Sequence, residues 1–320
     1  MNIELGLNKK VRRAYGIDEI ALVPGNRTLD YDLTDPSWSI GDFKREVPIV
    51  ASAMDSVVDV NTAVELTKLG SLGVINMEGI QTRYENPDEI LNQIASIGKN
   101  DFVPLMQKIY SEPVKEGLIV QRINEVKERG GIAAFSGTPQ AAIKFKKVIN
   151  NSKIDLFFLQ GTVVSTEHLG MEGKETLNIK DLCQSMNVPV VAGNCVTYEV
   201  AKLLMDAGVA GLMVGIGPGA ACTSRGVLGI GIPQATAIAD CSSATVFFRS
   251  LFSFFNGFTF FLKVSFCFFT AFIHIHSSLL FWTFILEIFR LFLALFRNEL
   301  LLRKRKQNNV IYNTIKNHDS

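Results

Sequence analysis

The chain has 320 residues, of which 48% are hydrophobic and 20% are charged. This supplies enough apolar side chains for a sizeable core, so it excludes an intrinsically disordered chain and a small disulfide-stapled fold. A formal net charge of +1 argues against a nucleic-acid-binding protein, because such domains carry a basic surface. Five cysteines without paired spacing, and no apolar signal segment after Met1, predict a reduced, cytoplasmic protein.

The composition changes abruptly after Ala244. All ten prolines and 24 of the 25 glycines precede that point, whereas 17 of the 23 phenylalanines follow it. The formal net charge is −5 over residues 1–244 and +6 over residues 245–320. A single globular domain does not separate turn-forming and aromatic residues in this way. We therefore expect a folded body over 1–244, a hydrophobic tail over 245–302 and a basic, polar end over 303–320.

Short, nearly continuous apolar runs alternate with longer amphipathic segments in the body, and such runs are typical of strands buried on both faces. The expected strands are Pro48–Ser52, Ser71–Asn76, Gly131–Ser136, Ile154–Gln160, Val188–Ala192 and Gly211–Gly215. The expected helices are Val60–Leu69, Pro87–Ile97, Val114–Arg129, Thr138–Ile149, Ile179–Met186 and Tyr198–Ala207. Strand–helix alternation at this spacing predicts an α/β fold built from parallel βαβ units.

A doubly wound sheet and a (β/α)8 barrel of the TIM type both fit this alternation. Polar, glycine-rich segments follow the expected strands: SAMDS, NMEG, SGTP, QGTV, GNCVT and GIGPG. Because a barrel places its chemistry at the carboxyl ends of its strands, these segments favour the barrel. About six β/α units precede the change of composition, so the predicted barrel is incomplete and its two edge strands are open.

The densest candidate site is the segment GIGPGAACTSRG, residues 215–226. Three glycines alternate at its start, which lets backbone N–H and C=O groups approach a small ion or a phosphate. Cys222 follows them, with Ser224 and Arg225 behind it. A thiol near loop amides and a guanidinium ionises more readily, which makes Cys222 a candidate nucleophile. A tight turn that carries a half-buried cysteine is the alternative interpretation of the same pattern.

Together with GIPQATA at residues 231–237, this segment resembles the active-site loop of the IMP dehydrogenase/GMP reductase family. Three further segments match the family in order: LVPG at 22–25, VPIVASAMDSV at 47–57 and VVAGNCVT at 190–197. The resemblance covers residues 16–244 and implies a purine-nucleotide oxidoreductase on a (β/α)8 barrel. Residues 76–131 leave no room for two regulatory CBS repeats, so the chain resembles the short branch of the family.

In that family a loop cysteine attacks C2 of the purine, and a hydride passes between C2 and a nicotinamide cofactor. The resemblance therefore implies an enzyme of GMP biosynthesis that oxidises IMP to XMP with NAD. GMP reductase, which converts GMP to IMP with NADPH, stays open because the loop serves both reactions. The expected ligands are a purine nucleotide (IMP, XMP or GMP) and NAD or NADP, and the expected assembly is a homotetramer without nucleic acid.

The resemblance also assigns roles to individual residues. The catalytic pair is Cys222, the nucleophile, and Ser224, which stands where the family usually has a threonine whose hydroxyl assists the chemistry. The residues expected at the nucleotide are Ser52, Met54, Asn194 and Gly219. Those expected at the cofactor are Gln160 and Gly161, and the carbonyl groups expected to hold potassium are those of Gly217, Gly219 and Cys222.

Some positions depart from the family pattern. Ala220 replaces a serine that helps to hold the 5′-phosphate. Phe157 aligns with an aspartate that dehydrogenases use on the cofactor ribose. A phenyl ring cannot accept that hydrogen bond, so we expect cofactor binding to differ there. Residues 245–320 contain nothing that resembles the family's last two strands, which bring ribose and phosphate contacts, so we expect little or no turnover from the chain as written.

The hydrophobic tail has two interpretations. Residues 251–273 and 277–296 are each long enough to cross a bilayer, and the basic residues 303–306 would keep the C terminus and the body in the cytosol. The chain would then be an inactive, membrane-attached barrel fragment, attached through residues 251–296. Alternatively, the tail is a translation of noncoding DNA. We prefer this second interpretation, because the composition changes inside a helix that resembles the family.

Overall fold

The computed structural model describes residues 2–4, 10–25, 30–40, 43–98, 101–161, 164, 177–219 and 222–245. All of them belong to one compact unit, Met1–Ser250. Within this described part of the chain, every helix is too short or too polar to traverse a lipid bilayer. The two expected membrane spans, 251–273 and 277–296, lie outside the described residues, so both interpretations of the tail stay predictions.

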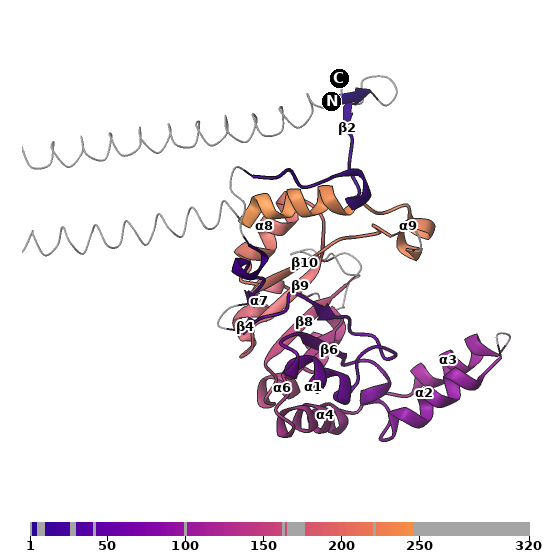
Figure 1. The fold of residues 1–320 in the computed structure, drawn as a ribbon. Coiled ribbons are helices and arrows are strands. Elements are labelled where there is room, and N and C mark those ends of the chain that lie inside the picture. The colour runs from indigo at the N-terminus through magenta and orange to yellow at the C-terminus, as the bar shows by residue number, and fades with distance from the viewer. Residues whose placement is uncertain are drawn as a thin grey trace, which may run out of the picture. The chain divides into compact units, whose positions relative to one another are not determined.

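The described residues form a sheet of six parallel strands that pair in chain order (Figure 1). They are β5 (Val50–Ala51), β6 (Leu72–Asn76), β7 (Ala134–Gly137), β8 (Leu156–Gln160), β9 (Val190–Cys195) and β10 (Gly211–Val214). A doubly wound sheet reverses its strand order at a switch point. Pairing from β5 to β10 without a reversal is the order of a TIM-type barrel, and the barrel prediction is therefore confirmed.

Helices follow the strands of the sheet, as βαβ units require. Their bounds are α1 (Val60–Lys68), α2 (Pro87–Ser96), α3 (Phe102–Ser111), α4 (Glu116–Glu128), α5 (Pro139–Lys144), α6 (Lys146–Asn151), α7 (Ile179–Ser185), α8 (Tyr198–Asp206) and α9 (Thr223–Leu228). A further helix occupies residues 234–245. Two short antiparallel pairs lie before the sheet: β1 (Asn2–Glu4) with β2 (Lys10–Arg12), and β3 (Trp38–Ile40) with β4 (Phe43–Arg45).

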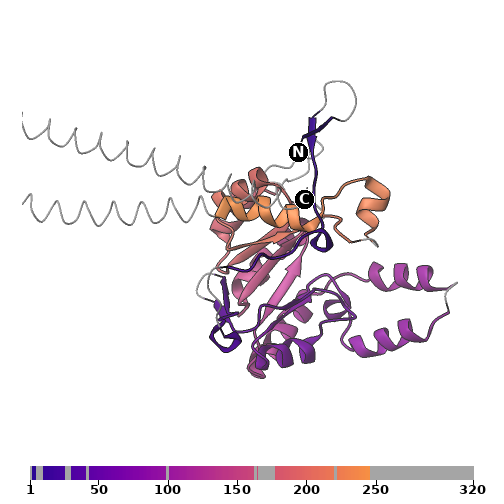
Figure 2. The ribbon, with the colours of Figure 1, turned by 45° about the horizontal axis from the view of Figure 1, so that its top comes forward.

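The observed helices differ from the expected ones in three places. The segment expected as one helix over 138–149 divides at Phe145 into α5 and α6. The sequence did not predict α9. It also did not predict α3, which forms a hairpin with α2 that extends away from the sheet (Figure 2). In α3 Ile109 is the buried residue, so this helix lacks the regular buried stripe that marks a helix packed on the core.

Two apolar clusters lie on opposite faces of the sheet, because successive strand residues point to opposite sides. Phe157 and Leu159 belong to the cluster that packs under the helices, whereas Leu156 and Phe158 belong to the inner cluster. Side chains of the β3–β4 pair, including Trp38, pack against that inner cluster. The inside of the curved sheet is thus filled with side chains, as in a barrel, and polar groups are left to the strand ends.

Arg122 of α4 anchors the segment that follows β6. The side chain is 7% exposed, and its Nε donates to the Gln81 carbonyl oxygen at 3.0 Å. Its terminal nitrogens donate to the Glu85 carbonyl oxygen at 2.7 Å and to both carboxylate oxygens of Glu125. A buried guanidinium that donates to several acceptors fixes their positions. If one of them moved away, both the acceptor and the buried charge would lose a hydrogen-bond partner.

We predict that Arg122→Met lowers the free energy of unfolding by about 2–4 kcal/mol, because methionine fills the space but donates no hydrogen bond. Urea denaturation of the full chain measures the change. The matched control is Arg129→Met at the C-terminal cap of α4, where the exposed side chain donates to Asn61 Oδ1 and the expected loss is below about 0.5 kcal/mol. Equal losses in the two variants would contradict the anchoring role of Arg122.

Candidate active site

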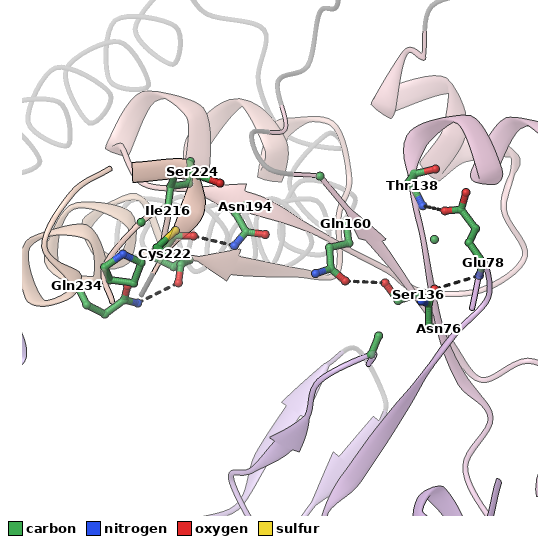
Figure 3. A pocket seen from close by; sticks show the side chains of 17 residues that line it. Asn76, Glu78, Ser136, Thr138, Gln160, Asn194, Ile216, Cys222, Ser224 and Gln234 are labelled. Carbon is green, nitrogen blue, oxygen red and sulfur yellow. Dashed lines mark hydrogen bonds between the residues drawn. The ribbon is translucent and has the colours of Figure 1, made fainter. Parts of the chain in front are cut away.

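A cleft of about 880 Å³ lies at the carboxyl ends of the parallel strands (Figure 3). This volume is typical of sites that bind small molecules, and the carboxyl face is where TIM-type barrels carry their chemistry. The described lining residues come from strand ends and the loops after them: Ala53, Asn76, Glu78, Ser136, Gly137, Thr138, Gln160, Gly161, Asn194, Val214, Gly215, Ile216, Gly217, Pro218, Cys222, Ser224 and Gln234.

The loop after β10 takes a path that requires glycine. Gly215 has φ +133°, and a Cβ atom there would lie 2.5 Å from Gln234 Oε1. Gly217 has φ +61°, and a Cβ atom there would lie 2.8 Å from the Ile230 carbonyl oxygen. Gln234 also donates from Nε2 to the Val214 carbonyl oxygen at 2.9 Å. The end of β10 and its loop are therefore packed directly against residues 230–234.

Cys222 directly precedes α9 and lines the cleft as a free thiol. The backbone N–H of Arg225 lowers the pKa of this thiol, and hydrogen bonds from Ser224 and Gly217 act in the same direction. Burial has the opposite effect on Cys195 and Cys241, and raises the pKa of Cys241 to about 12. A thiolate is the nucleophilic form of cysteine, so Cys222 is the described cysteine best placed to react.

Hydrogen bonds join neighbouring strand ends across the floor of the cleft. Asn194 Nδ2 donates to the Gly215 carbonyl oxygen at 2.7 Å, which ties β9 to the loop after β10. The Ser136 hydroxyl donates to Gln160 Oε1 at 2.9 Å, which ties β7 to β8. The Gly161 N–H donates to the Gly193 carbonyl oxygen at 2.9 Å. These bonds hold the amide side chains of Asn194 and Gln160 in fixed positions at the cleft (Figure 3).

The structure brings together six of the nine residues to which the sequence assigned a role. Lining the cleft are Cys222, Ser224, Asn194, Gln160, Gly161 and Gly217. Ser52, Met54 and Gly219 are not among its described lining residues, and the loop after β5 contributes Ala53 instead. Ser52 and Met54 are exposed on either side of Ala53, in a tight turn where the Met54 N–H donates to the Ser52 carbonyl oxygen at 2.8 Å.

The carbonyl groups expected to hold potassium already accept hydrogen bonds within the chain. The Gly219 oxygen accepts from the Cys222 N–H at 3.2 Å, and the Cys222 oxygen accepts from the Gly226 N–H at 3.1 Å. A monovalent cation requires carbonyl oxygens that point to a common centre. A carbonyl oxygen has two lone pairs, so these hydrogen bonds do not decide the matter; potassium at this loop stays a prediction, and we derive no step through it. The described residues also contain no group of three His, Cys, Asp or Glu side chains placed to hold a metal ion.

Sequence reasoning missed several cleft residues: Asn76, Glu78, Ser136, Thr138 and Gln234. All of them except Gln234 belong to NMEG and SGTP, two of the polar segments that follow expected strands, so their position carried a signal. Phe157, which aligns with the family's aspartate for the cofactor ribose, is not among the described lining residues. Its ring is fully buried in the cluster under the helices, so the side chain at this position points away from the cleft. Ala220 lies outside the described residues.

Comparisons with known proteins agree on one family. The IMP dehydrogenase / GMP reductase domain matches residues 14–249. An uncharacterized oxidoreductase of Mycobacterium leprae is 35% identical over 248 residues, which cover 76% of this chain and 66% of the relative. An inosine-5′-monophosphate dehydrogenase of Cryptosporidium parvum is 29% identical over 248 residues, which cover 73% of this chain and 59% of the relative.

A solved structure has the same fold. The crystal structure of an IMP dehydrogenase/GMP reductase-like protein from Corynebacterium glutamicum superposes with a TM-score of 0.69 at 30% sequence identity. The match covers 76% of this chain and 64% of that protein. The chain thus spans about two thirds or less of the length of these relatives.

We predict that iodoacetamide alkylates Cys222 faster than Cys183, Cys195 and Cys241 at neutral pH. The thiolate is the reactive form, so the rate rises with pH through the pKa, and a lowered pKa moves the midpoint to lower pH. Peptide mass spectrometry across a pH series measures the midpoint for each cysteine. A midpoint for Cys222 at or above that of Cys183, whose pKa is raised by burial, would contradict the assignment.

We predict that Gly217→Ala moves the alkylation midpoint of Cys222 to higher pH and destabilises the loop by about 1–3 kcal/mol. Alanine at φ +61° is strained and its Cβ meets the Ile230 carbonyl oxygen, so the Gly217 N–H is displaced from the thiol. Gly219→Ala is the matched control, because a Cβ there has no neighbour within 4 Å among the described residues. The same pH series serves both variants, and an unchanged midpoint in Gly217→Ala would refute the prediction.

Proposed function

The chain belongs to the IMP dehydrogenase/GMP reductase domain family, and on this premise we propose that its cleft is built for the oxidation of IMP to XMP with NAD through a covalent bond to Cys222, with little turnover expected from the chain as written. The observation that carries the proposal is a thiol of lowered pKa in a cleft of nucleotide size, at the carboxyl ends of parallel strands. Membership of the family establishes an oxidoreductase fold, and the particular substrate is our inference.

Cys222 performs the first step. Its thiolate adds to C2 of the purine, a C–S bond forms, and the electron pair of the C2=N3 bond moves onto N3. The N–H groups that stabilise the thiolate hold the sulfur beside the glycine loop. Loss of a hydride from C2 then restores the C2=N3 bond and leaves a thioimidate on Cys222. Water attacks C2, and the thiolate leaves. The oxygen remains on C2 as the new carbonyl of XMP, one proton of the water passes to N3, and the other is released.

Two neighbours of Cys222 assist this chemistry. The Ser224 hydroxyl lowers the pKa of the Cys222 thiol, so it can stabilise the thiolate when that group leaves. Asn194 uses its amide nitrogen on the Gly215 carbonyl oxygen, and its carboxamide oxygen is turned into the cleft, where it can accept an N–H of the purine ring (Figure 3). These contacts orient the base against the sulfur, which is the main requirement for an addition step.

The cleft also suits a nicotinamide dinucleotide. Amide and hydroxyl side chains at the ends of β7 and β8, Ser136 and Gln160 among them, match the carboxamide and ribose hydroxyl groups of such a cofactor. When bound, the nicotinamide ring accepts the hydride that leaves C2. Gln160 is held by Ser136 through its oxygen, so its amide nitrogen remains a donor toward a ligand in the cleft.

We predict that saturating IMP slows the alkylation of Cys222 at least fivefold, because the base covers the sulfur. Alkylation of Cys183 is the internal control and is expected to be unchanged. Any NADH formed from IMP and NAD must disappear in Cys222→Ala, since the hydride leaves only from the sulfur adduct. The measurements are peptide mass spectrometry for alkylation and absorbance for NADH.

Three outcomes would count against the proposal. An alkylation rate of Cys222 that does not change with IMP would contradict the nucleotide site. NADH formation that persists in Cys222→Ala would contradict the covalent step. Oxidation of NADPH in the presence of GMP, with no NADH formed from IMP, would assign the chain to the reductase direction instead.

A further inference from the structure

The cleft has a second polar end, away from Cys222. There, at the carboxyl ends of β6 and β7, lie Asn76, Glu78, Ser136 and Thr138 (Figure 3). The covalent step at the purine uses none of these side chains. Their arrangement therefore calls for a separate ligand group, which would lie beyond the base along the cleft.

Glu78 is held in place from several sides. Its Oε2 accepts from the Thr138 N–H at 2.7 Å, and its own N–H donates to Asn76 Oδ1 at 3.0 Å. Its carbonyl oxygen accepts from Arg83 Nε at 2.9 Å. Thr138 in turn caps α5, because its side chain accepts from the Ala141 N–H. One carboxylate oxygen is thus engaged by the backbone, and the group is positioned before any ligand binds.

The charge at this end of the cleft is unbalanced. Among the described lining residues Glu78 is the one carboxylate, and none of them is Lys, Arg or His. A carboxylate accepts hydrogen bonds strongly from hydroxyl groups. Arg83 contacts the backbone of Glu78 but is not among the described lining residues, so toward a ligand in the cleft the carboxylate repels a phosphate group. The second end of the cleft therefore selects a ligand group that donates hydroxyl hydrogens and carries no negative charge.

We infer that Glu78 binds the vicinal diol of a ribose in a nicotinamide dinucleotide and makes the cleft selective for NAD(H) over NADP(H). This inference rests on the proposed function, which places such a cofactor in the cleft. An acidic residue on the ribose hydroxyls is the general way in which proteins recognise NAD, whereas the 2′-phosphate of NADP calls for arginine. Gln160 Nε2, the donor left over from the Ser136 contact, can bind a ribose oxygen beside Glu78.

The test is a comparison of NADH and NADPH binding to the full chain in the presence of IMP, with which neither reduced dinucleotide reacts in the proposed chemistry. Fluorescence of the reduced nicotinamide follows binding without turnover. The variant is Glu78→Gln, whose carboxamide oxygen can still accept from the Thr138 N–H while the negative charge is lost. Glu116→Gln, at an exposed carboxylate on α4, is the matched control.

The wild-type chain is expected to bind NADH at least tenfold more tightly than NADPH. Glu78→Gln should weaken the binding of NADH roughly tenfold, because a charge-assisted hydrogen bond is lost. The ratio between the affinities for NADH and NADPH should therefore become smaller. Glu116→Gln should change neither the affinity for NADH nor this ratio. Thermal unfolding of each variant shows whether it is folded, and Glu78→Asp, which keeps the charge, should preserve the preference for NADH if Glu78→Gln unfolds.

Equal or tighter binding of NADPH, no binding of NADH, or a preference that survives in Glu78→Gln would overturn the inference. Protection of Cys222 from alkylation by IMP is measured on the same samples. If IMP protects Cys222 while the dinucleotide results fail, the role of Glu78 is wrong and the nucleotide site stands. If IMP does not protect, the proposed function itself has failed.

Discussion

A side chain at Gly215 would place its Cβ 2.5 Å from Gln234 Oε1, and one at Gly217 would place its Cβ 2.8 Å from the Ile230 carbonyl oxygen. This close approach of two backbone segments determines where the loop after β10 runs. The N–H groups that lower the pKa of Cys222 belong to that loop and to the first turn of α9. The reactivity of the thiol therefore depends on the packing of glycine against residues 230–234, and not on a neighbouring base.

The strand ends and the loops after them line one cleft, and this cleft has two chemically distinct ends. Parallel strands in chain order bring their carboxyl ends to one face, so residues far apart in the sequence, such as Glu78 and Cys222, line the same cleft. One end carries the Cys222 thiol, whose pKa is lowered, and the other carries the Glu78 carboxylate, an acceptor of hydrogen bonds. Side-chain bonds between neighbouring strands, including Ser136 to Gln160, keep the two ends at a fixed separation, as the proposed reaction between two bound ligands requires.

The sequence predicted those features that depend on local pattern. All six strands overlap the expected ones, and the four central strands, β6 to β9, are largely buried, as their apolar runs predict. The glycine-rich segment likewise marked the position of Cys222. The sequence did not predict α3, whose exposed residues give no buried stripe, or the cleft role of Glu78, because one carboxylate in a polar loop has no periodicity. The sequence also did not single out Ala53, which lies between Ser52 and Met54 and lines the cleft. The direction of a side chain after a two-residue strand depends on backbone torsions, which the sequence pattern does not give.

The helix over 234–245 connects the loop to the start of the chain. Thr236 forms reciprocal hydrogen bonds with Tyr15: its N–H donates to the Tyr15 carbonyl oxygen, and its Oγ1 accepts from the Tyr15 N–H at 2.8 Å. Arg12 forms an ion pair with Asp240 on the same helix. Gln234, which packs on Gly215, begins this helix. The family match begins at residue 14, next to this contact. The N-terminal segment therefore helps to position Gln234, the residue against which the loop after β10 packs.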